Sequence, residues 1–191
     1  VIFFGRDVSG SMGPAERKVV SYLCDLCEFW LAQNYDLLEK VYIIHDDRAA
    51  RVSREEFFTI NWGGGTTCSV ALSKIHEIID MEFPVSQWNI YVIYLSDGFN
   101  WSSDNEIFLN LLGEKILPIV NQFNYAQIAM HRPWWPAYNK SGASTFSSPG
   151  TLGQEILKRF PNVENLAYAE VATGNFESVV DAIKRFFKKG T

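Results

Sequence analysis

Cysteine, histidine and positive charge are all scarce in this chain. Its 191 residues include three cysteines and three histidines. Three cysteines cannot form an even disulfide framework, and Cys24, Cys27 and Cys68 lack partners at the spacing of a zinc site. We therefore interpret the three thiols as small buried apolar groups of a protein in a reducing compartment.

The charge balance and the lack of long apolar runs argue against two classes of partner. The 17 Lys and Arg residues stand against 22 Asp and Glu, which gives a formal net charge of −5. This balance argues against a broad nucleic-acid surface. No apolar run approaches the length of a membrane span. We expect neither nucleic acid nor a membrane among the partners.

The chain does contain enough apolar residues for a sizeable core. Hydrophobic residues make up 47% of the sequence and aromatic residues 15%, and this length suits one domain. We predict a single domain over residues 1–191. Because the sequence opens on Val-Ile-Phe-Phe without a methionine, we expect it to be part of a longer polypeptide.

Strand and helix patterns alternate along the chain. Buried strands are predicted at residues 1–4, 40–45, 89–95, 125–130 and 165–171, with a short strand or edge segment at 56–60. Helices are predicted at residues 14–34, 66–81, 105–121, 151–160 and 175–188. This alternation indicates an α/β fold with a central, mostly parallel sheet of about six strands and helices on both faces.

Three short polar segments occur where apolar stretches end. They are Asp7-Val8-Ser9-Gly10-Ser11, Gly64-Gly65-Thr66 and Leu95-Ser96-Asp97-Gly98. Ligands of such sheets bind beyond the carboxyl ends of the strands, so the three segments are expected to meet at one rim. Their carboxylates and hydroxyls are oxygen donors, which hard cations such as Mg²⁺ and Mn²⁺ prefer. The sequence therefore predicts a divalent-cation site made of Asp7, Ser9, Ser11, Thr66 and Asp97.

Together the three segments resemble the metal-ion-dependent adhesion site of von Willebrand factor type A (VWA) domains. That family carries an Asp-x-Ser-x-Ser signature, completed by a later Thr and Asp. The resemblance implies a three-layer, Rossmann-like fold. It also implies that Ser9, Ser11 and Thr66 coordinate the cation through their hydroxyls, whereas Asp7 and Asp97 act largely through waters.

Neutral hydroxyl ligands leave the charge of a bound cation undercompensated, so the cation attracts a further anion. In VWA domains this anion is typically a carboxylate of a partner protein. We therefore predict a metal-dependent protein-binding module, not an enzyme, whose partner presents an acidic residue to Mg²⁺ or Mn²⁺.

Several blocks resemble the bacterial YeaH/YhbH family more closely, a family that includes a sporulation protein. The blocks are residues 5–13, residues 55–58, Gly64-Gly65-Thr66 and the stretch Ser96-Asp97-Gly98-x-Asn100-Trp101. The resemblance implies a cytoplasmic bacterial protein with its VWA-like domain in the C-terminal half. It also implies partners in a stress or sporulation system, among which a protein kinase is one candidate.

Simpler roles are open to the same residues. Ser9 or Ser11 could cap the first helix, Thr66 could cap the second, and Asp97-Gly98 could form a plain turn. Thr67 is an alternative to Thr66 as a ligand, although VWA domains place the ligand directly after the glycines. Three further acids near the expected rim are interpreted as solvated surface residues: Asp46, Asp47 and Asp104.

The rival function is a metal-dependent phosphohydrolase of the haloacid-dehalogenase-like type with Asp7 as its nucleophile. Those enzymes carry a second Asp two residues later as the general acid, and this chain has Ser9 there. A serine hydroxyl cannot protonate a leaving group at neutral pH. The Gly63–Thr67 stretch also lacks the lysine of a P-loop.

One aromatic loop is the remaining candidate for a functional surface. Trp134, Trp135 and Tyr138 lie among prolines in residues 132–138. They could form a partner-binding surface or fold back as a hydrophobic cover over the sheet edge, and we favour the cover because large exposed aromatic patches are uncommon.

Overall fold

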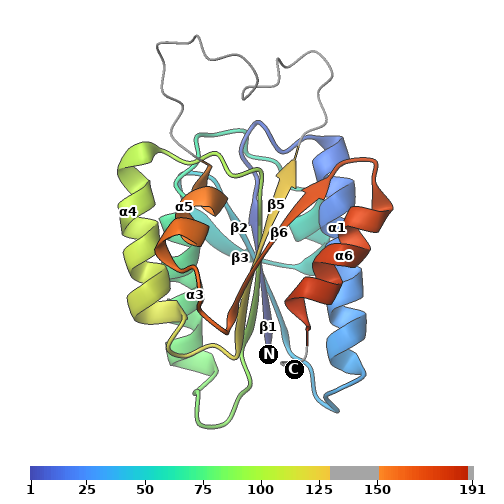
Figure 1. The fold of residues 1–191 in the computed structure, drawn as a ribbon, viewed down its shortest axis with the longest axis vertical. Coiled ribbons are helices and arrows are strands. Elements are labelled where there is room, and N and C mark those ends of the chain that lie inside the picture. The colour runs from blue at the N-terminus through green and yellow to red at the C-terminus, as the bar shows by residue number, and fades with distance from the viewer. Residues whose placement is uncertain (130–150, 189–191) are drawn as a thin grey trace.

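The structure, a computed structural model, describes residues 1–129 and 151–188. Within these residues one six-stranded sheet forms the centre of the molecule, in the order β3-β2-β1-β4-β5-β6 (Figure 1). Neighbouring strands run parallel except for β2 and β3, which are antiparallel. The strands are β1 (Ile2–Asp7), β2 (Lys40–His45), β3 (Ala49–Val52), β4 (Tyr91–Ser96), β5 (Gln122–Ala129) and β6 (Leu166–Ala172).

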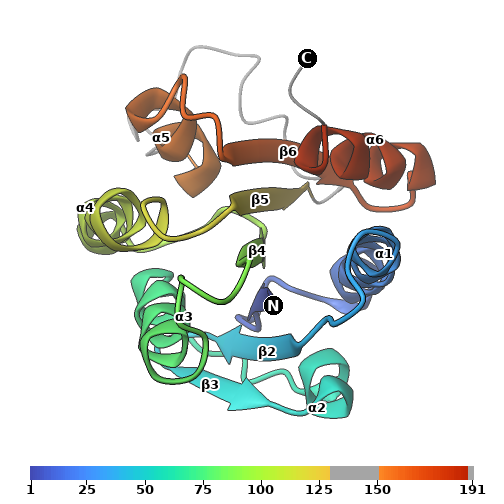
Figure 2. The ribbon, with the colours of Figure 1, turned by 90° about the horizontal axis from the view of Figure 1, so that it is seen from below.

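Helices cover both faces of this sheet and make the outer two of three layers. The view from below separates α1, α2 and α6 on one face from α3, α4 and α5 on the other (Figure 2). Their bounds are α1 (Pro14–Ala32), α2 (Arg54–Thr59), α3 (Ser69–Glu82), α4 (Ser102–Leu111), α5 (Leu152–Arg159) and α6 (Phe176–Phe186). The predicted α/β class, the mostly parallel sheet and its two helical layers are confirmed.

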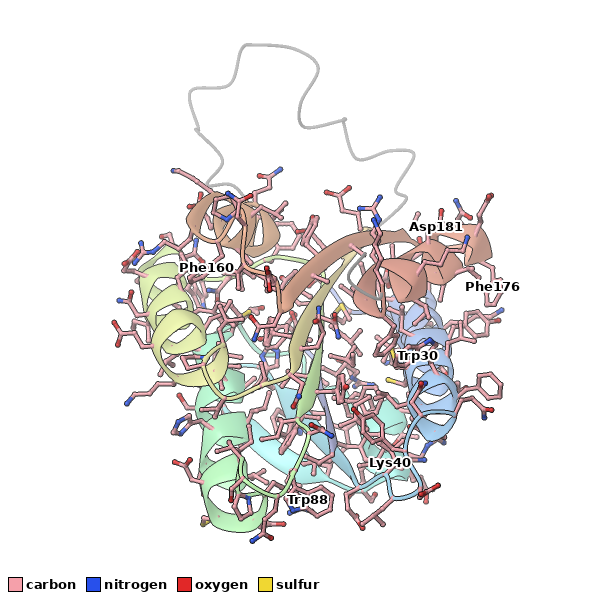
Figure 3. The ribbon with its side chains drawn as sticks, turned by 60° about the horizontal axis from the view of Figure 1, so that its bottom comes forward. Trp30, Lys40, Trp88, Phe160, Phe176 and Asp181 are labelled. Carbon is pink, nitrogen blue, oxygen red and sulfur yellow. The ribbon has the colours of Figure 1, made fainter. Side chains whose placement is uncertain are left out.

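The core has two parts, one on each face of the sheet, because the central strands are apolar on both sides. All six residues of β1 are buried, as expected for a central parallel strand covered by helices on each face. One apolar cluster, which includes Phe3 and Ile75, lies under α3 and α4, and a second, which includes Phe4 and Leu23, lies under α1. Figure 3 shows how densely side chains fill both spaces, with Trp30 of α1 on one side and Trp88 at the lower end.

Two predicted elements were wrong in type or extent. Of the segment 56–60, predicted as a strand or edge segment, residues 56–59 belong to α2 and Ile60 is its C-cap, because Ser53 and Glu56 form a reciprocal capping box that starts a helix. The edge strand is instead β3. The long helix predicted at 105–121 ends as α4 at Leu111 and continues as a single wide turn at Leu112–Ile116.

The loop with Trp134 and Trp135 lies outside the described residues, so both of its interpretations remain predictions. No helix among residues 1–129 and 151–188 is long and apolar enough to cross a membrane.

Candidate metal site

The loop after β1 is organised around the carboxylate of Asp7. Its Oδ1 accepts a hydrogen bond from the Ser9 amide at 2.8 Å, and its Oδ2 accepts one from the Ser96 hydroxyl at 2.9 Å. The Ser9 and Ser11 hydroxyl oxygens lie 3.2 Å apart. Asp7 is fully buried, and Ser9 is 2% exposed. The first segment therefore gathers one carboxylate and two hydroxyls at the carboxyl end of a central strand.

The loop after β4 carries the second carboxylate. Asp97 Oδ1 accepts a hydrogen bond from the Phe99 amide at 3.0 Å. Its Oδ2 is buried and has no hydrogen-bond partner among the described residues. A buried carboxylate oxygen without a partner is costly unless something else neutralises it. This oxygen is the strongest sign that the site is built for a ligand.

Backbone hydrogen bonds tie the Thr66 loop to both other segments. The Gly63 amide donates to the Val8 carbonyl at 3.2 Å, which joins this loop to the one after β1. The Trp101 amide donates to the Thr66 carbonyl at 3.2 Å, which joins it to the segment after β4. Because β1 pairs with β4 in the sheet, all three predicted segments meet at the upper end of the view in Figure 1.

The capping roles considered for these hydroxyls are not the ones observed. The N-cap of α1 is Gly13 and the N-cap of α3 is Cys68, and neither helix start has a side-chain cap. Ser9, Ser11 and Thr66 are therefore not held at the rim by helix capping. Asp97 does form a tight local turn with Phe99, and Gly98 between them lies in the left-handed region at φ +87°.

Burial of the two carboxylates disfavours their charged forms. Desolvation raises the pKa of Asp7, although hydrogen bonds from Ser9 and Ser96 oppose the shift. Desolvation, followed by repulsion from Asp7, raises the pKa of Asp97 to about 6, and the Ser11 hydroxyl opposes it. Two buried acids that repel each other favour a cation between or beside them.

The neighbouring acids differ from the solvated surface that the sequence predicted. Asp104 is 4% exposed and accepts hydrogen bonds from the Ser69 amide, at 2.9 Å, and from the Ser69 hydroxyl. Asp46 is 7% exposed and accepts from the Arg48 amide at 3.1 Å. Only Asp47 is exposed as expected, and it accepts from the Thr67 hydroxyl at 3.1 Å. Thr67 thus has a partner of its own within the chain.

Two residues of the site were missed at the sequence level. Ser96 holds Asp7 in place, and Asn100 accepts from the Cys68 amide at 3.0 Å while donating to Asn105 at 2.8 Å. Ser96 ends a parallel strand next to Asp97, and this position alone was the signal that could have marked it. Asn100 offered no such signal, because its partners come from other elements.

The donor set fits a hard cation but not a soft one. No group of three or more His, Cys, Asp or Glu side chains in the described part of the chain is placed to hold a metal. The donors available at the rim are instead two carboxylates and three hydroxyls, which are oxygen ligands of the kind that Mg²⁺ and Mn²⁺ take.

Sequence comparison places the chain in a family. A profile described as "Protein of unknown function (DUF444)" matches residues 1–190. The chain belongs to the DUF444 family. The UPF0229 protein of Legionella pneumophila strain Corby is 33% identical over 193 residues, which cover all of this chain and 41% of that protein. This DUF444 chain thus spans less than half the length of that relative.

Solved structures share the architecture of this DUF444 domain at low sequence identity. The SpRpn10 VWA domain matches with a TM-score of 0.62 at 8% identity and covers 96% of this chain and 93% of its own. The manganese-loaded TRAP protein of Plasmodium vivax matches with a TM-score of 0.59 at 14% identity, over 97% of this chain and 72% of its own. The DUF444 domain therefore has a VWA-like fold.

Proposed function

We propose that this DUF444 domain is a metal-dependent protein-binding module. The observation that carries the proposal is the meeting of three loops at one rim, which also carries the buried Oδ2 of Asp97 that has no hydrogen-bond partner among the described residues. Ser9, Ser11 and Thr66 would hold Mg²⁺ or Mn²⁺ through their hydroxyls, with Asp7 and Asp97 in support. The manganese in a VWA-like neighbour is consistent with this assignment.

The partner is proposed to be a protein that presents a carboxylate. A bound divalent cation would supply a positive charge that hydroxyl ligands leave largely uncompensated. The chain's own residues contribute by fixing the rim: Ser96 orients Asp7 and the Phe99 amide orients Asp97. A site prepared in this way binds a carboxylate without needing a general acid or base.

The proposed setting is a cytoplasmic bacterial stress or sporulation system, with a protein kinase as one candidate partner. This proposal rests on the resemblance to the YeaH/YhbH family in residues 5–13, residues 55–58, Gly64-Gly65-Thr66 and the Ser96–Trp101 segment. The UPF0229 relatives are compatible with a bacterial origin.

The rival phosphohydrolase function has weaker support from the same geometry. An Asp7 nucleophile would need a free carboxylate oxygen that faces the substrate. Both oxygens of Asp7 instead accept hydrogen bonds within the protein, and its side chain is fully buried. Ser9, at the position of the general acid, lies with its hydroxyl beside Ser11.

Titration calorimetry on the full-length protein tests the metal assignment. We expect Mg²⁺ or Mn²⁺ to bind the wild type and binding to be lost in the double variant Ser9→Ala, Thr66→Ala. Thr67→Ala is the matched control, because it removes a neighbouring hydroxyl that already bonds to Asp47. If the double variant binds metal as tightly as the wild type does, Ser9 and Thr66 are not the ligands and the assignment is wrong.

A paired assay separates binding from catalysis. Partner capture is measured with Mg²⁺, with EDTA and with Asp7→Ala, and hydrolysis of phosphate esters and nucleotides is measured under the same conditions. We expect a defined protein, identified by mass spectrometry, to be captured only when both metal and Asp7 are present. Robust hydrolysis that disappears in Asp7→Ala, with capture indifferent to metal, would favour the enzyme instead.

A further inference from the structure

Two large aromatic side chains stand exposed beside the candidate metal site. Phe99 is 55% exposed and Trp101 is 60% exposed. They belong to the segment that connects Asp97 to α4, so they lie two and four positions after a predicted ligand. Large apolar side chains exposed together at a functional rim are typical of a protein-binding surface.

The backbone that carries these aromatics is fixed by the site itself. The Phe99 amide donates to Asp97 at 3.0 Å, and the Trp101 amide donates to the Thr66 carbonyl at 3.2 Å. Between them, Asn100 turns toward the protein and bonds to the Cys68 amide and to Asn105. The backbone at Phe99 and Trp101 is consequently fixed before any partner arrives, which lowers the entropic cost of binding.

An acidic side chain lies beside Trp101. An added Cβ at Gly65 would be 3.0 Å from the Trp101 indole nitrogen and 2.8 and 2.9 Å from the two carboxylate oxygens of Asp47. Asp47 is exposed and accepts hydrogen bonds from the Gly65 amide and the Thr67 hydroxyl. The proposed cation, and not the neighbouring side chains, is therefore the group that would attract a partner carboxylate at this rim.

We infer that this rim recognises an acidic residue together with a large apolar neighbour. The partner is a protein segment in which a carboxylate reaches the cation while an apolar side chain, one or two residues away, packs on Phe99 and Trp101. This inference rests on the proposed function, because the carboxylate bound to the metal fixes which residue of the partner segment lies over Phe99 and Trp101.

A peptide-display selection against the Mg²⁺-loaded, full-length protein tests the inference. We expect the enriched peptides to combine an acidic residue with Phe, Trp, Leu or Ile within two positions. The double variant Phe99→Ser, Trp101→Ser should weaken binding of the best synthetic peptide by about tenfold or more, as expected for buried aromatic contacts. Phe29→Ser is the matched control, since Phe29 is 65% exposed on α1 and lies outside the site.

The possible failures differ between the two proposals. The enriched peptides could be acidic and metal-dependent but show no apolar preference, or the double variant could bind the peptide as tightly as the wild type does. Either result overturns the proposed contact with Phe99 and Trp101 and leaves the proposed function standing. Enrichment that EDTA does not reduce overturns the proposed function, and the inference with it. Selection of no peptide, with light scattering showing a Mg²⁺-dependent dimer, assigns the rim to a second copy of the chain and overturns the inference.

Discussion

At the scale of single residues, the fold strongly changes the titration of His45. Its ring is fully buried, Nε2 lies 2.8 Å from the Tyr94 hydroxyl, and Nδ1 has no partner among the described residues. Desolvation lowers the pKa of His45 to about 4, against the opposing influence of Asp46 and Asp104. The protein therefore holds a neutral imidazole at physiological pH.

This shift predicts that His45 makes the fold less stable in mild acid. The unfolded chain protonates His45 near pH 6.5, whereas the folded protein resists protonation until about pH 4, so the unfolded state binds the extra proton. His45 should therefore lower the free energy of unfolding as pH drops from 6.5 to 4, by ~3 kcal/mol at most. The raised pKa of Asp97 acts in the opposite direction over the same range, so the contribution of His45 is measured as the difference between His45→Gln and the wild type. In urea titrations, the free energy of unfolding of His45→Gln relative to that of the wild type should rise as pH drops through this range. A difference that does not change with pH would contradict the prediction.

At the scale of elements, the turn after β4 depends on Gly98. Its φ of +87° lies in the left-handed region, and an added Cβ would come within 2.8 Å of Gln127 Oε1 and 3.1 Å of Thr151 Cβ. The Leu152 amide also donates to the Gly98 carbonyl at 3.0 Å. The Asp97 turn is thus packed between β5 and the start of α5, which limits how far it can move.

Gly98→Ala should therefore disturb the site as well as the backbone. Gly174, with a φ of +79° and nothing within 4 Å of an added Cβ, is the matched control. Gly174→Ala should cost only the backbone strain, ~1–2 kcal/mol. Gly98→Ala should cost more in thermal denaturation and should also weaken Mg²⁺ binding, whereas Gly174→Ala should leave Mg²⁺ binding unchanged. Equal destabilisation by the two variants would contradict this prediction, because it would show that Gln127 and Thr151 move away from the added Cβ at no cost in free energy.

Elements differ in how well the sequence predicts them. The central strands were predicted because continuous β-branched and aromatic runs leave few alternatives. The strand β3 was missed because its four residues, Ala49–Val52, are short and weakly apolar. The end of the α-helix at Leu111 did have a local signal, because Gly113 and Pro118 both disfavour the interior of a helix. The packing of Gly113 against the Phe160 ring, where an added Cβ would lie 3.0 Å away, had none.

The candidate site shows the same division. Its five expected residues lie in three loops that meet at one rim, because strands β1 and β4 are parallel neighbours whose ends must coincide. The burial of Asp104 could not be predicted, since its partner Ser69 lies 35 residues away. The position of Ser96 pointed to the rim but not to its hydrogen bond with Asp7, 89 residues away. The order of strands and polar segments along the sequence predicts that the three loops meet at one rim. Which acidic side chains are buried there depends on tertiary packing.

At the scale of the whole molecule, a bound cation should stabilise the fold. Anything that binds the folded state alone raises its stability, by ~2.7 kcal/mol at a hundred times the dissociation constant. For a domain of this size we expect a rise in Tm of about 5–10 °C with Mg²⁺, measured by calorimetry on the transition of this domain. Ser9→Ala, Thr66→Ala should show no rise, and a rise in that variant would locate the metal elsewhere.

The hydrogen bond from Ser96 to Asp7 also bears on how the protein is made. It joins residues 89 positions apart, and β1 lies in the sheet between β2 and β4. During synthesis β1 and β2 emerge first, but one edge of β1 stays open until β4 has left the ribosome. A nascent chain that ends before β4 lacks both Ser96 and Asp97, so it cannot assemble the rim. The cation can therefore bind and stabilise only a chain whose central strands have already paired, and it cannot start their folding.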